Sequence, residues 1–266
     1  MNDQRPTGHV RYDNAGRVVI VTGGASGIGR SICLAFADSG ARVVCADVND
    51  PGESFPATVA HRICDTSDEQ QCQQTVDQVI NEFGAVDVLV NNAAIQPRAS
   101  YRPIDQLATE VWNRMVAVNL SGYAFMAKYA LRQMRRAQSG VIVNIASGQA
   151  HRTAREVGVY GPIKAANVMQ TRQWGVEYAR EGIRVVSVSP GAIDTPLVRA
   201  SLEAQGGGAA LANRHPLGRI GRPDEIAAAV LWLSSDDASF ITATDLEVDG
   251  GLGAFGAFAD PYPMPE

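Results

Sequence analysis

The chain has 266 residues, of which 45% are hydrophobic, and its 28 acidic and 23 basic side chains give a formal net charge of −5. This composition is typical of a globular protein, and the acidic balance offers no attraction to nucleic acid or anionic lipid. No apolar run reaches the ~18 residues of a membrane span. Residues 1–16 predict a polar leader without the apolar segment of a secretory signal. We therefore expect a cytoplasmic protein with neither nucleic-acid nor membrane partners.

Apolar, β-branched runs recur along the chain, with segments of helix length between them. The runs expected to be strands are 18–22, 41–47, 86–92, 140–147, 183–190 and 245–248, and a further strand is expected to end at Asp65. The expected helices are 27–39, 67–83, 105–137, 159–180 and 223–234. Strands of nearly continuous hydrophobicity are typical of parallel strands covered on both faces. The pattern predicts an α/β fold, a single Rossmann-like domain whose doubly wound parallel sheet has about seven strands and helices on both faces.

Three further features complete this organisation, in which residues 17–253 form the domain. Residues 192–216 contain GGG and have no strand period, which predicts a substrate lid. The tail, 254–266, is rich in Gly, Phe and Pro, and it is either disordered or docked on a neighbouring subunit. The cysteines have no metal-ligand spacing, so no metal is expected, and they are interpreted as core residues in a reducing compartment. They are Cys33, Cys45, Cys64 and Cys72.

A glycine-rich turn, TGGASGIG (22–29), directly follows the first expected strand and opens a helix. Gly23 and Gly29 permit a tight turn and a close approach of helix to strand, and Gly27 lets the backbone meet a pyrophosphate. The helix N-terminus then offers unpaired N–H groups to that phosphate. Any tight turn between a strand and a helix favours glycine, so this motif alone is a weak signal.

Polar residues at the ends of later strands strengthen that interpretation. Asp47 ends the second strand about 20 residues after the glycine turn, as expected of the acid that binds a ribose hydroxyl pair. Asp65 could accept a bond from an adenine amino group, or it could be a turn or capping aspartate, although Ser67 is the better cap candidate. The small residues of NNAA (91–94) would form a wall against a flat ring. All lie at carboxyl ends of strands, where open α/β sheets bind ligands.

Six motifs occur in the order and with the spacing of one family. They are TGGASGIG, NNAA, VNL (118–120), NIAS (144–147), YGPIK (160–164) and PGAIDTP (190–196). The chain resembles the short-chain dehydrogenase/reductase family over about residues 17–253, with Ala94 where the family more often has glycine. The resemblance implies an oxidoreductase that transfers a hydride between NAD(H) and a secondary alcohol or ketone. The implied cofactor-binding residues are Gly23, Ser26, Gly27, Ile28, Gly29, Asp47, Val48, Asp65, Thr66, Asn92, Ala93, Ala94, Tyr160, Lys164, Pro190, Gly191, Ile193 and Thr195.

Tyr160 and Lys164 have the chemistry that such a reaction needs. Hydride transfer to a carbonyl requires a proton donor, and the reverse reaction requires a base. A free tyrosine titrates near pH ~10, and a cation beside it lowers that pKa. Lys164, four residues on, lies on the same helix face. Pro162 is tolerated because it falls in the first turn of a helix capped by Gly158.

The other two expected catalytic residues are Ser147 and Asn119. Ser147 ends the fifth strand, where its hydroxyl would orient the substrate oxygen and stabilise its charge. The resemblance implies that Lys164 also holds the nicotinamide ribose and that Asn119 takes part in a water-mediated proton relay linked to Lys164. The alternative for a mid-helix asparagine is an exposed face, yet its neighbours Val118 and Leu120 are expected to be buried.

The residues around Asp47 favour NAD over NADP. A 2′-phosphate would meet the like charge of Asp47. Neither Ala25 and Ser26 in the turn nor Val48 and Asn49 after the strand supply a cation. Arg30 is already inside the helix.

Several alternatives stay open at this point. A non-catalytic dinucleotide-sensing protein, or a lyase or dehalogenase without the cofactor, would keep the fold, but the intact motifs argue against both. His151, Arg152, Arg155 and Arg98 indicate either an acidic substrate or a solvated surface. The resemblance implies a homo-oligomer, a tetramer or a dimer, formed through helices 105–137 and 159–180. Phe125 and Trp174 are either part of that interface or core residues.

Overall fold

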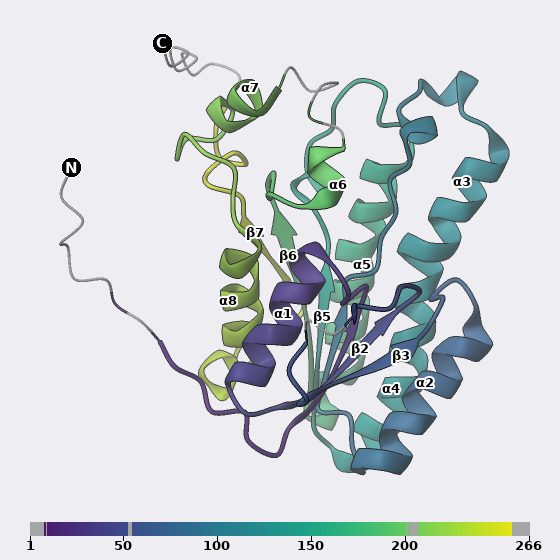
Figure 1. The fold of residues 1–266 in the computed structure, drawn as a ribbon, viewed down its shortest axis with the longest axis vertical. Coiled ribbons are helices and arrows are strands. Elements are labelled where there is room, and N and C mark those ends of the chain that lie inside the picture. Colours follow the sequence, from purple (N-terminus) through teal and green to yellow (C-terminus); the bar gives the residue numbers. More distant parts are fainter. Residues whose placement is uncertain (1–7, 9, 53–54, 201, 203–206, 257–266) are drawn as a thin grey trace.

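The computed structural model describes residues 8, 10–52, 55–200, 202 and 207–256 (Figure 1). The strands are β1 (Val18–Thr22), β2 (Arg42–Asp47), β3 (Val59–Ile63), β4 (Val88–Asn91), β5 (Gly140–Ile145), β6 (Ile183–Pro190) and β7 (Thr244–Val248). The helices are α1 (Gly27–Asp38), α2 (Glu69–Phe83), α3 (Thr109–Val116), α4 (Gly122–Ala137), α5 (Tyr160–Tyr178), α6 (Pro196–Arg199), α7 (Gly207–Asn213) and α8 (Pro223–Ser234). A π-helical segment, Ala117–Ser121, joins α3 to α4.

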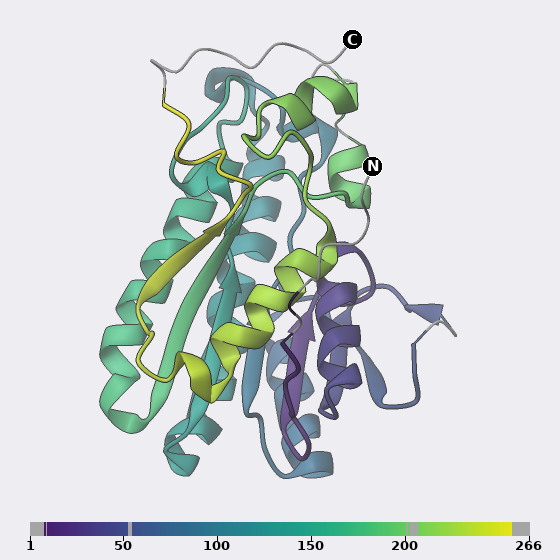
Figure 2. The ribbon, with the colours of Figure 1, turned by 90° about the vertical axis from the view of Figure 1, so that its left-hand side faces the viewer.

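The strands form one parallel sheet of seven in the order β3-β2-β1-β4-β5-β6-β7. This is the doubly wound arrangement expected from the sequence, in which the order reverses between β1 and β4. Because all strands run the same way, their carboxyl ends lie along one edge of the sheet. The short helices α6 and α7 follow β6 at that edge (Figure 2).

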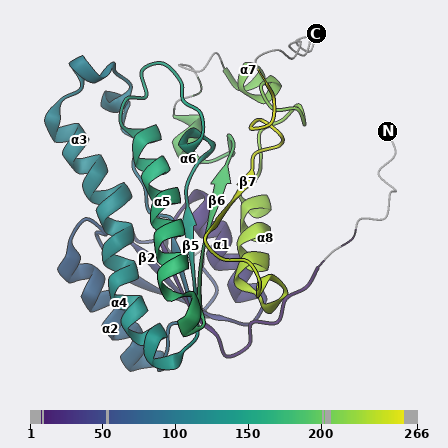
Figure 3. The same cartoon turned by 180° about the vertical axis from the view of Figure 1, so that it is seen from behind.

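Each strand contributes to two cores because successive side chains point to opposite faces. In β1, Val19 and Val21 pack in the core formed with α1 and α8, whereas Val18 and Ile20 pack in the core formed with α2 and α4. Figure 1 shows α1 and α8 in front of the sheet, and Figure 3 shows α2, α4 and α5 on the opposite face. Burial on both faces explains why the strands read as continuous apolar runs.

Most expected elements are confirmed to within two residues, and 18–22, 183–190 and 223–234 match fully. β3 ends at Ile63, two residues before the expected end, so Asp65 lies beyond the strand. This edge strand reads VAHRI and leaves Ile63 62% exposed. One side of an edge strand faces solvent, so its sequence lacks the apolar run of a central strand.

The single helix expected over 105–137 is wrong at its start and in its middle. The α-helix begins at Thr109, after an isolated 3₁₀ turn, and the π-helical segment interrupts it. There the side chain of Asn119 bonds to the main chain of Ile95, with Nδ2 donating to the carbonyl and Oδ1 accepting from the N–H, each at 2.8 Å. Single π turns inside α-helices occur frequently at functional sites.

Two predicted helix caps are also wrong. Asp68, and not Ser67, caps α2 by accepting the N–H groups of Gln70 and Gln71. The Ser67 hydroxyl instead donates to Asp65. Val159, rather than Gly158, precedes the first residue of α5. Pro162 still lies in the first turn of α5, where the missing N–H has no intrahelical partner to lose.

The expected lid is not wholly irregular, because its described part contains α6 and α7. All four cysteines are buried and free, as expected of core residues. Residues 257–266 of the tail, and residues 1–7 and 9 of the leader, lie outside the described residues. Among the residues described, no helix combines the length and apolar character needed to cross a membrane.

Candidate active site

A cavity of about 300 Å³ opens at the carboxyl ends of the strands. All predicted cofactor-binding residues except Gly29 line it, and so do three of the four predicted catalytic residues, Asn119 being the exception. Sequence reasoning did not assign the remaining lining residues to the site. These are Asn49, Cys64, Ile95, Arg114, Val118, Ile145, Ala146, Pro196, Leu197 and Val198. Several of them are next to a predicted site residue in the sequence, and this adjacency is the signal from which they could have been predicted.

The glycine turn brings β1 and α1 into close contact. Gly23 and Gly27 have φ angles of 64° and 54°, a backbone region that favours glycine. A Cβ on Gly29 would lie 2.1 Å from the Gly23 carbonyl oxygen, so Gly29 supports the turn from beneath and does not line the cavity. Gly27 and Ile28 line the cavity, which places the first turn of α1 against any ligand there. This arrangement fits an anionic group, because a helix N-terminus attracts negative charge.

Asp47 is fixed at the other side of the turn. One carboxylate oxygen accepts the N–H of Ala25 at 3.0 Å, and the other accepts the N–H of Asn49 at 2.9 Å. The backbone N–H groups of Ala25, in the glycine turn, and of Asn49, just after β2, therefore hold the Asp47 carboxylate in place. Arg30 lies elsewhere, with its guanidinium 4.9 Å from the centre of the Phe55 ring, and it does not line the described cavity.

Asp65 has the turn role that the sequence left open, and it also lines the cavity. It accepts from the N–H and hydroxyl of Ser67 and from Arg114 of α3 at 3.0 Å. Burial raises the pKa of Asp65, but the hydrogen bonds from Ser67 and Arg114 outweigh that effect and leave the pKa below its usual value. Arg114 was not predicted, since nothing in its helix distinguishes it from a solvated surface residue.

Ser147, Tyr160 and Lys164 line the cavity close to one another. The Lys164 Nζ lies 5.7 Å from the centre of the Tyr160 ring, so the two residues share a face of α5 as predicted. The pKa of Tyr160 is raised to about 12, mainly by burial and also by the neighbouring Tyr101, while a bond with Ser147 lowers it. Burial lowers the pKa of Lys164 to about 7. For the polypeptide by itself, burial thus outweighs any lowering of the Tyr160 pKa by Lys164, and a lowered Tyr160 pKa beside an oxidised nicotinamide stays a prediction.

Asn119 is fully buried behind this site, and the alternative of an exposed face is wrong. Val118 is buried as expected, whereas Leu120 is only half-buried. The backbone carbonyl of Asn119 accepts a bond from the Asn167 side chain of α5 at 3.1 Å. Asn119 therefore ties the π-helical segment both to Ile95 in the cavity wall and to the helix that bears Lys164.

The backbone after β6 is held from several directions. Ile193 pairs with Gly221 in an isolated β-bridge, where Asp194 donates to Gly221 and Gly221 donates to Ala192. His215, buried in the segment after α7, has its Nε2 at 3.1 Å from the Ala192 N–H and its Nδ1 at 3.0 Å from the Leu211 carbonyl. These contacts require an imidazole whose Nδ1 carries the proton, so that Nε2 can accept. The predicted lid consequently starts and ends beside Ile193.

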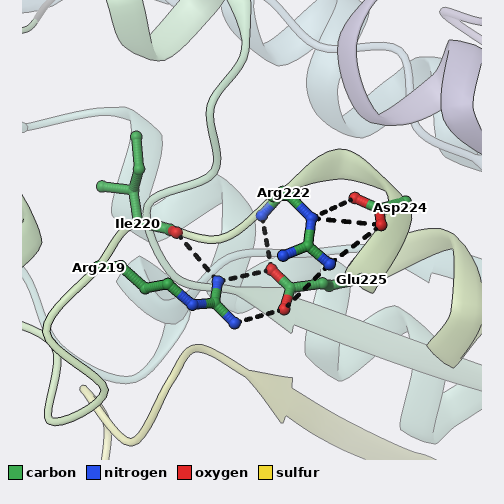
Figure 4. Close-up of polar contacts among 5 residues, drawn as sticks. All are labelled: Arg219, Ile220, Arg222, Asp224 and Glu225. Carbon is green, nitrogen blue, oxygen red and sulfur yellow. Dashed lines mark hydrogen bonds and ion pairs between the residues drawn. The ribbon is translucent and has the colours of Figure 1, made fainter. Parts of the chain in front are cut away.

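An ion-pair cluster fixes the point where the chain returns from the lid to α8. Figure 4 shows Glu225 between the guanidinium groups of Arg219 and Arg222. Arg219 donates to both carboxylate oxygens, at 2.6 and 2.8 Å, and the Arg222 N–H donates to Glu225 at 2.7 Å. The bond from Arg219 is the largest influence on the Glu225 pKa, which lies at about 2.

The charged loop before α5 is largely engaged within the protein. His151 contacts Asp245 at 2.7 Å, and Arg152 pairs with Glu247 at 2.8 Å, both acids belonging to β7. Arg98 and Arg155 are not among the lining residues of the described cavity. The surface alternative therefore fits His151 and Arg152 better than recognition of an acidic substrate.

Comparison with known proteins places this fold and site in one class. Residues 23–253 match a family model described as enoyl-(acyl carrier protein) reductase. The chain is 41% identical over 253 residues to a cis-4-hydroxycyclohexanecarboxylate dehydrogenase of Sinomonas cyclohexanicum, covering 90% of this chain and 98% of that protein. The chain belongs to the short-chain dehydrogenase/reductase family, and it is an oxidoreductase of that family.

Solved structures agree with this assignment. The ligand-free aldohexose dehydrogenase of Thermoplasma acidophilum has a TM-score of 0.87 and 38% identity, over 94% of this chain and 98% of that one. A 3-ketoacyl-(acyl-carrier-protein) reductase from Brucella melitensis complexed with NADH has a TM-score of 0.83 and 30% identity, over 90% of this chain and 99% of that one. A further neighbour, ElxO, has NADP bound, with a TM-score of 0.83 and 29% identity over the same shares.

The Glu225 cluster generates a prediction on stability and pH. Glu225→Gln should lower the free energy of unfolding by about 1 kcal/mol. The value is kept this small because solvent screens the exposed arginines. The Glu225 pKa is depressed from its ordinary 4.5 to about 2, so its contribution is present above pH 4.5 and is lost as the pH falls toward 2. Thermal unfolding of both proteins across this range measures the difference.

The matched control is Asp224→Asn, because Asp224 pairs only with Arg222 among the bonds described and its side chain is 64% exposed. Asp224→Asn should lower the free energy of unfolding by less than Glu225→Gln does in the pH range where Glu225 is charged. If Glu225→Gln lowered the melting temperature equally at pH 7 and near pH 2, the ion pair would not be the cause.

Proposed function

We propose that the protein interconverts a secondary alcohol and its ketone, using NAD(H) as the hydride carrier. The observation that carries this proposal is that Ser147, Tyr160 and Lys164, which lie close to one another, line the same cavity as the glycine turn and Asp47. The first group supplies side chains for proton transfer, and the second supplies groups for phosphate and ribose binding. The separate alternatives of a sensor or a cofactor-free lyase gain no support, since the named relatives above are dehydrogenases and reductases.

Tyr160 donates its proton to the substrate oxygen during ketone reduction and takes it back during alcohol oxidation. Its raised pKa keeps the hydroxyl protonated at neutral pH, which suits the donor role. Ser147 hydrogen-bonds the same substrate oxygen and orients it toward Tyr160. A bound nicotinamide would supply the hydride in ketone reduction and accept one in alcohol oxidation, and its oxidised form would add a positive charge that favours the phenolate. Asn119 keeps its predicted place in a relay linked to Lys164.

The remaining groups hold the cofactor. The first turn of α1, with Ser26, Gly27 and Ile28, binds the pyrophosphate, and Asp47 accepts from the adenosine ribose hydroxyls. Asp65 and Thr66 lie at the adenine, and Asn92, Ala93 and Ala94 form the wall beside the ribose and ring. The backbone of Ile193 and the hydroxyl of Thr195 bind the carboxamide of the nicotinamide. Pro190 and Gly191 shape the approach to it, and Lys164 bonds the nicotinamide ribose.

The substrate body is proposed to be an alicyclic secondary alcohol. Ile95, Leu197 and Val198 are among the apolar residues that line the cavity. A relative that is 41% identical is named for cis-4-hydroxycyclohexanecarboxylate, which is a hydroxylated cyclohexane ring with a carboxylate. The residues 192–216 would act as the lid over this body. Four free, buried thiols support the cytoplasmic location expected from the sequence.

The central test is Tyr160→Phe, assayed with NAD⁺ and a panel of cyclic and open-chain secondary alcohols by NADH absorbance. Turnover should fall by ~10²–10⁴, as for other lost acid–base groups, while folding and NADH binding are preserved. Tyr178→Phe, at the opposite end of the same helix, is the control and should leave turnover unchanged. Retention of most activity by Tyr160→Phe would remove the centre of this mechanism. Silence of the unmodified protein with the whole panel would favour the sensor.

The cofactor preference is tested by comparing NAD and NADP. The carboxylate of Asp47 would repel a 2′-phosphate, so NAD should exceed NADP by at least ~100-fold in kcat/KM, which corresponds to ~2.7 kcal/mol. Asp47→Ala should shrink that ratio mainly by weakening NAD. Asp50→Ala, an exposed aspartate after the same strand, should leave it unchanged. Equal kcat/KM with both cofactors in the unmodified enzyme would refute the preference.

A homo-oligomer, a tetramer or a dimer, is also proposed. Phe125 and Trp174 pack against the core, so the core alternative fits them better than an interface role. The outer face of α5 instead exposes Met169 and Val176, at 58% and 73%. Contiguous exposed apolar side chains mark association surfaces. Light scattering should give a mass of two or four chains at micromolar concentration, and a stable monomer would refute the proposal.

A further inference from the structure

Tyr123 is a buried tyrosine outside the family motifs on which the site was assigned. It is the second residue of α4, on the face that packs against the sheet, and only 1% of it is exposed. Its hydroxyl donates to the carbonyl of Ile145, the last residue of β5, at 2.9 Å. Ile145 lines the cavity and lies two residues before Ser147. A buried phenol hydroxyl needs a partner, and here that partner belongs to the active-site strand.

The same hydroxyl and the same carbonyl are the partners of Lys164. The Lys164 Nζ donates to the Ile145 carbonyl at 2.7 Å and to the Tyr123 hydroxyl at 3.2 Å. The three polar groups therefore form a closed triangle, in which the Tyr123 hydroxyl both donates and accepts. The Nζ also lies 5.1 Å from the centre of the Tyr123 ring and 5.7 Å from that of Tyr160, so both aromatic rings are within cation–π range.

This triangle matters because Lys164 is 1% exposed and has no ion-pair partner among the described residues. A buried ammonium without a carboxylate depends on dipoles and ring faces for its stabilisation. The titratable side chains that face it are Tyr123 of α4 and Tyr160 of its own helix, with Tyr101 beyond Tyr160. Burial raises the Tyr123 pKa well above its usual value, so Tyr123 stays neutral and can act only as a fixed dipole.

We propose that Tyr123 is a positioning residue for Lys164. Its hydroxyl accepts from the ammonium, and its ring contributes a negative face, so that the lysine stays charged and directed at Tyr160 and at the ribose of the cofactor. This inference rests on the proposed function, because it assigns Lys164 its two tasks. Tyr123 acts through Lys164 and contacts neither the substrate nor the described cavity.

The test is Tyr123→Phe, which retains the ring and its packing and removes the hydroxyl alone. With one acceptor lost, the lysine charge is less stable and the Tyr160 phenolate is stabilised less. The acid limb of kcat/KM for alcohol oxidation should therefore move to higher pH, by ~0.5–1 pH unit, equivalent to a ~3–10-fold loss at fixed pH on that limb. NADH affinity, measured by fluorescence titration without substrate, should weaken in parallel.

The matched control is Tyr129→Phe, in the same helix. Tyr129 is also buried, and its hydroxyl bonds to Glu69 at 3.0 Å, away from Lys164. A larger upward displacement of the acid limb in Tyr123→Phe than in Tyr129→Phe supports the proposal. An acid limb displaced no more than in the control overturns it, even if turnover or melting temperature falls, because a merely structural tyrosine would not move a titration.

The two proposals can fail separately. If the unmodified protein oxidised no alcohol in the panel, the proposed reaction would fail and the NADH titration would decide the role of Tyr123. Weaker NADH binding by Tyr123→Phe than by Tyr129→Phe would then support the positioning role, and equal binding would overturn it. If the unmodified enzyme is active and its acid limb is unaffected by the change, only the Tyr123 inference fails.

Discussion

The structure depends first on the close contact between β1 and α1 at Gly23 and Gly29. With no Cβ at Gly29, the helix starts against the carbonyl of Gly23, and its first turn faces the edge where all strands end. The parallel direction of the sheet then brings distant segments to the same edge: Asp47 at the end of β2, Asn92 after β4, Ser147 after β5 and Ile193 after β6. The close contact of β1 with α1 and the common direction of the strands thus assemble a site from segments spread over most of the chain.

A second constraint concerns charge in the interior. The catalytic end combines a phenol and an ammonium, each shifted by burial toward its neutral form. The polypeptide by itself therefore opposes the ion pair that the proposed alcohol oxidation would require. A cationic ligand beside these two residues would change this balance, whereas the proposed ketone reduction would start from the protonation state that burial favours. In the proposed reaction, its direction and the oxidation state of the cofactor would be linked through the same two residues.

The sequence was sufficient for the fold class and for 18 of the 28 residues that line the cavity, because both depend on local patterns. Continuous apolar runs identify strands buried on two faces, and glycine or acid residues at strand ends identify the ligand edge. It was insufficient where tertiary contacts decide. The exposed edge strand β3 has no apolar run. The π-helical segment is accompanied by a hydrogen bond between Asn119 and Ile95, which are distant in sequence. Arg114 bonds Asp65 and Tyr123 bonds Lys164, but the sequence around each is that of an ordinary surface or core helix. The upward shift of the Tyr160 pKa in the polypeptide by itself was not predicted for the same reason, since the extent of desolvation depends on tertiary packing.

The bridge between Ile193 and Gly221 has a consequence for how such a protein can diversify. The chain leaves the bridge at Ile193 and returns to it at Gly221, so the two ends of the intervening segment are fixed side by side whatever its length. The entropy of closing a loop rises only slowly as residues are added. Insertions, deletions and new side chains in this segment can therefore alter which molecules are enclosed without moving the backbone at Ile193, where the nicotinamide is proposed to bind. Variation in substrate range would thereby be separated from the geometry of the proposed hydride transfer, and one scaffold could acquire new activities by changing a single loop segment of the chain.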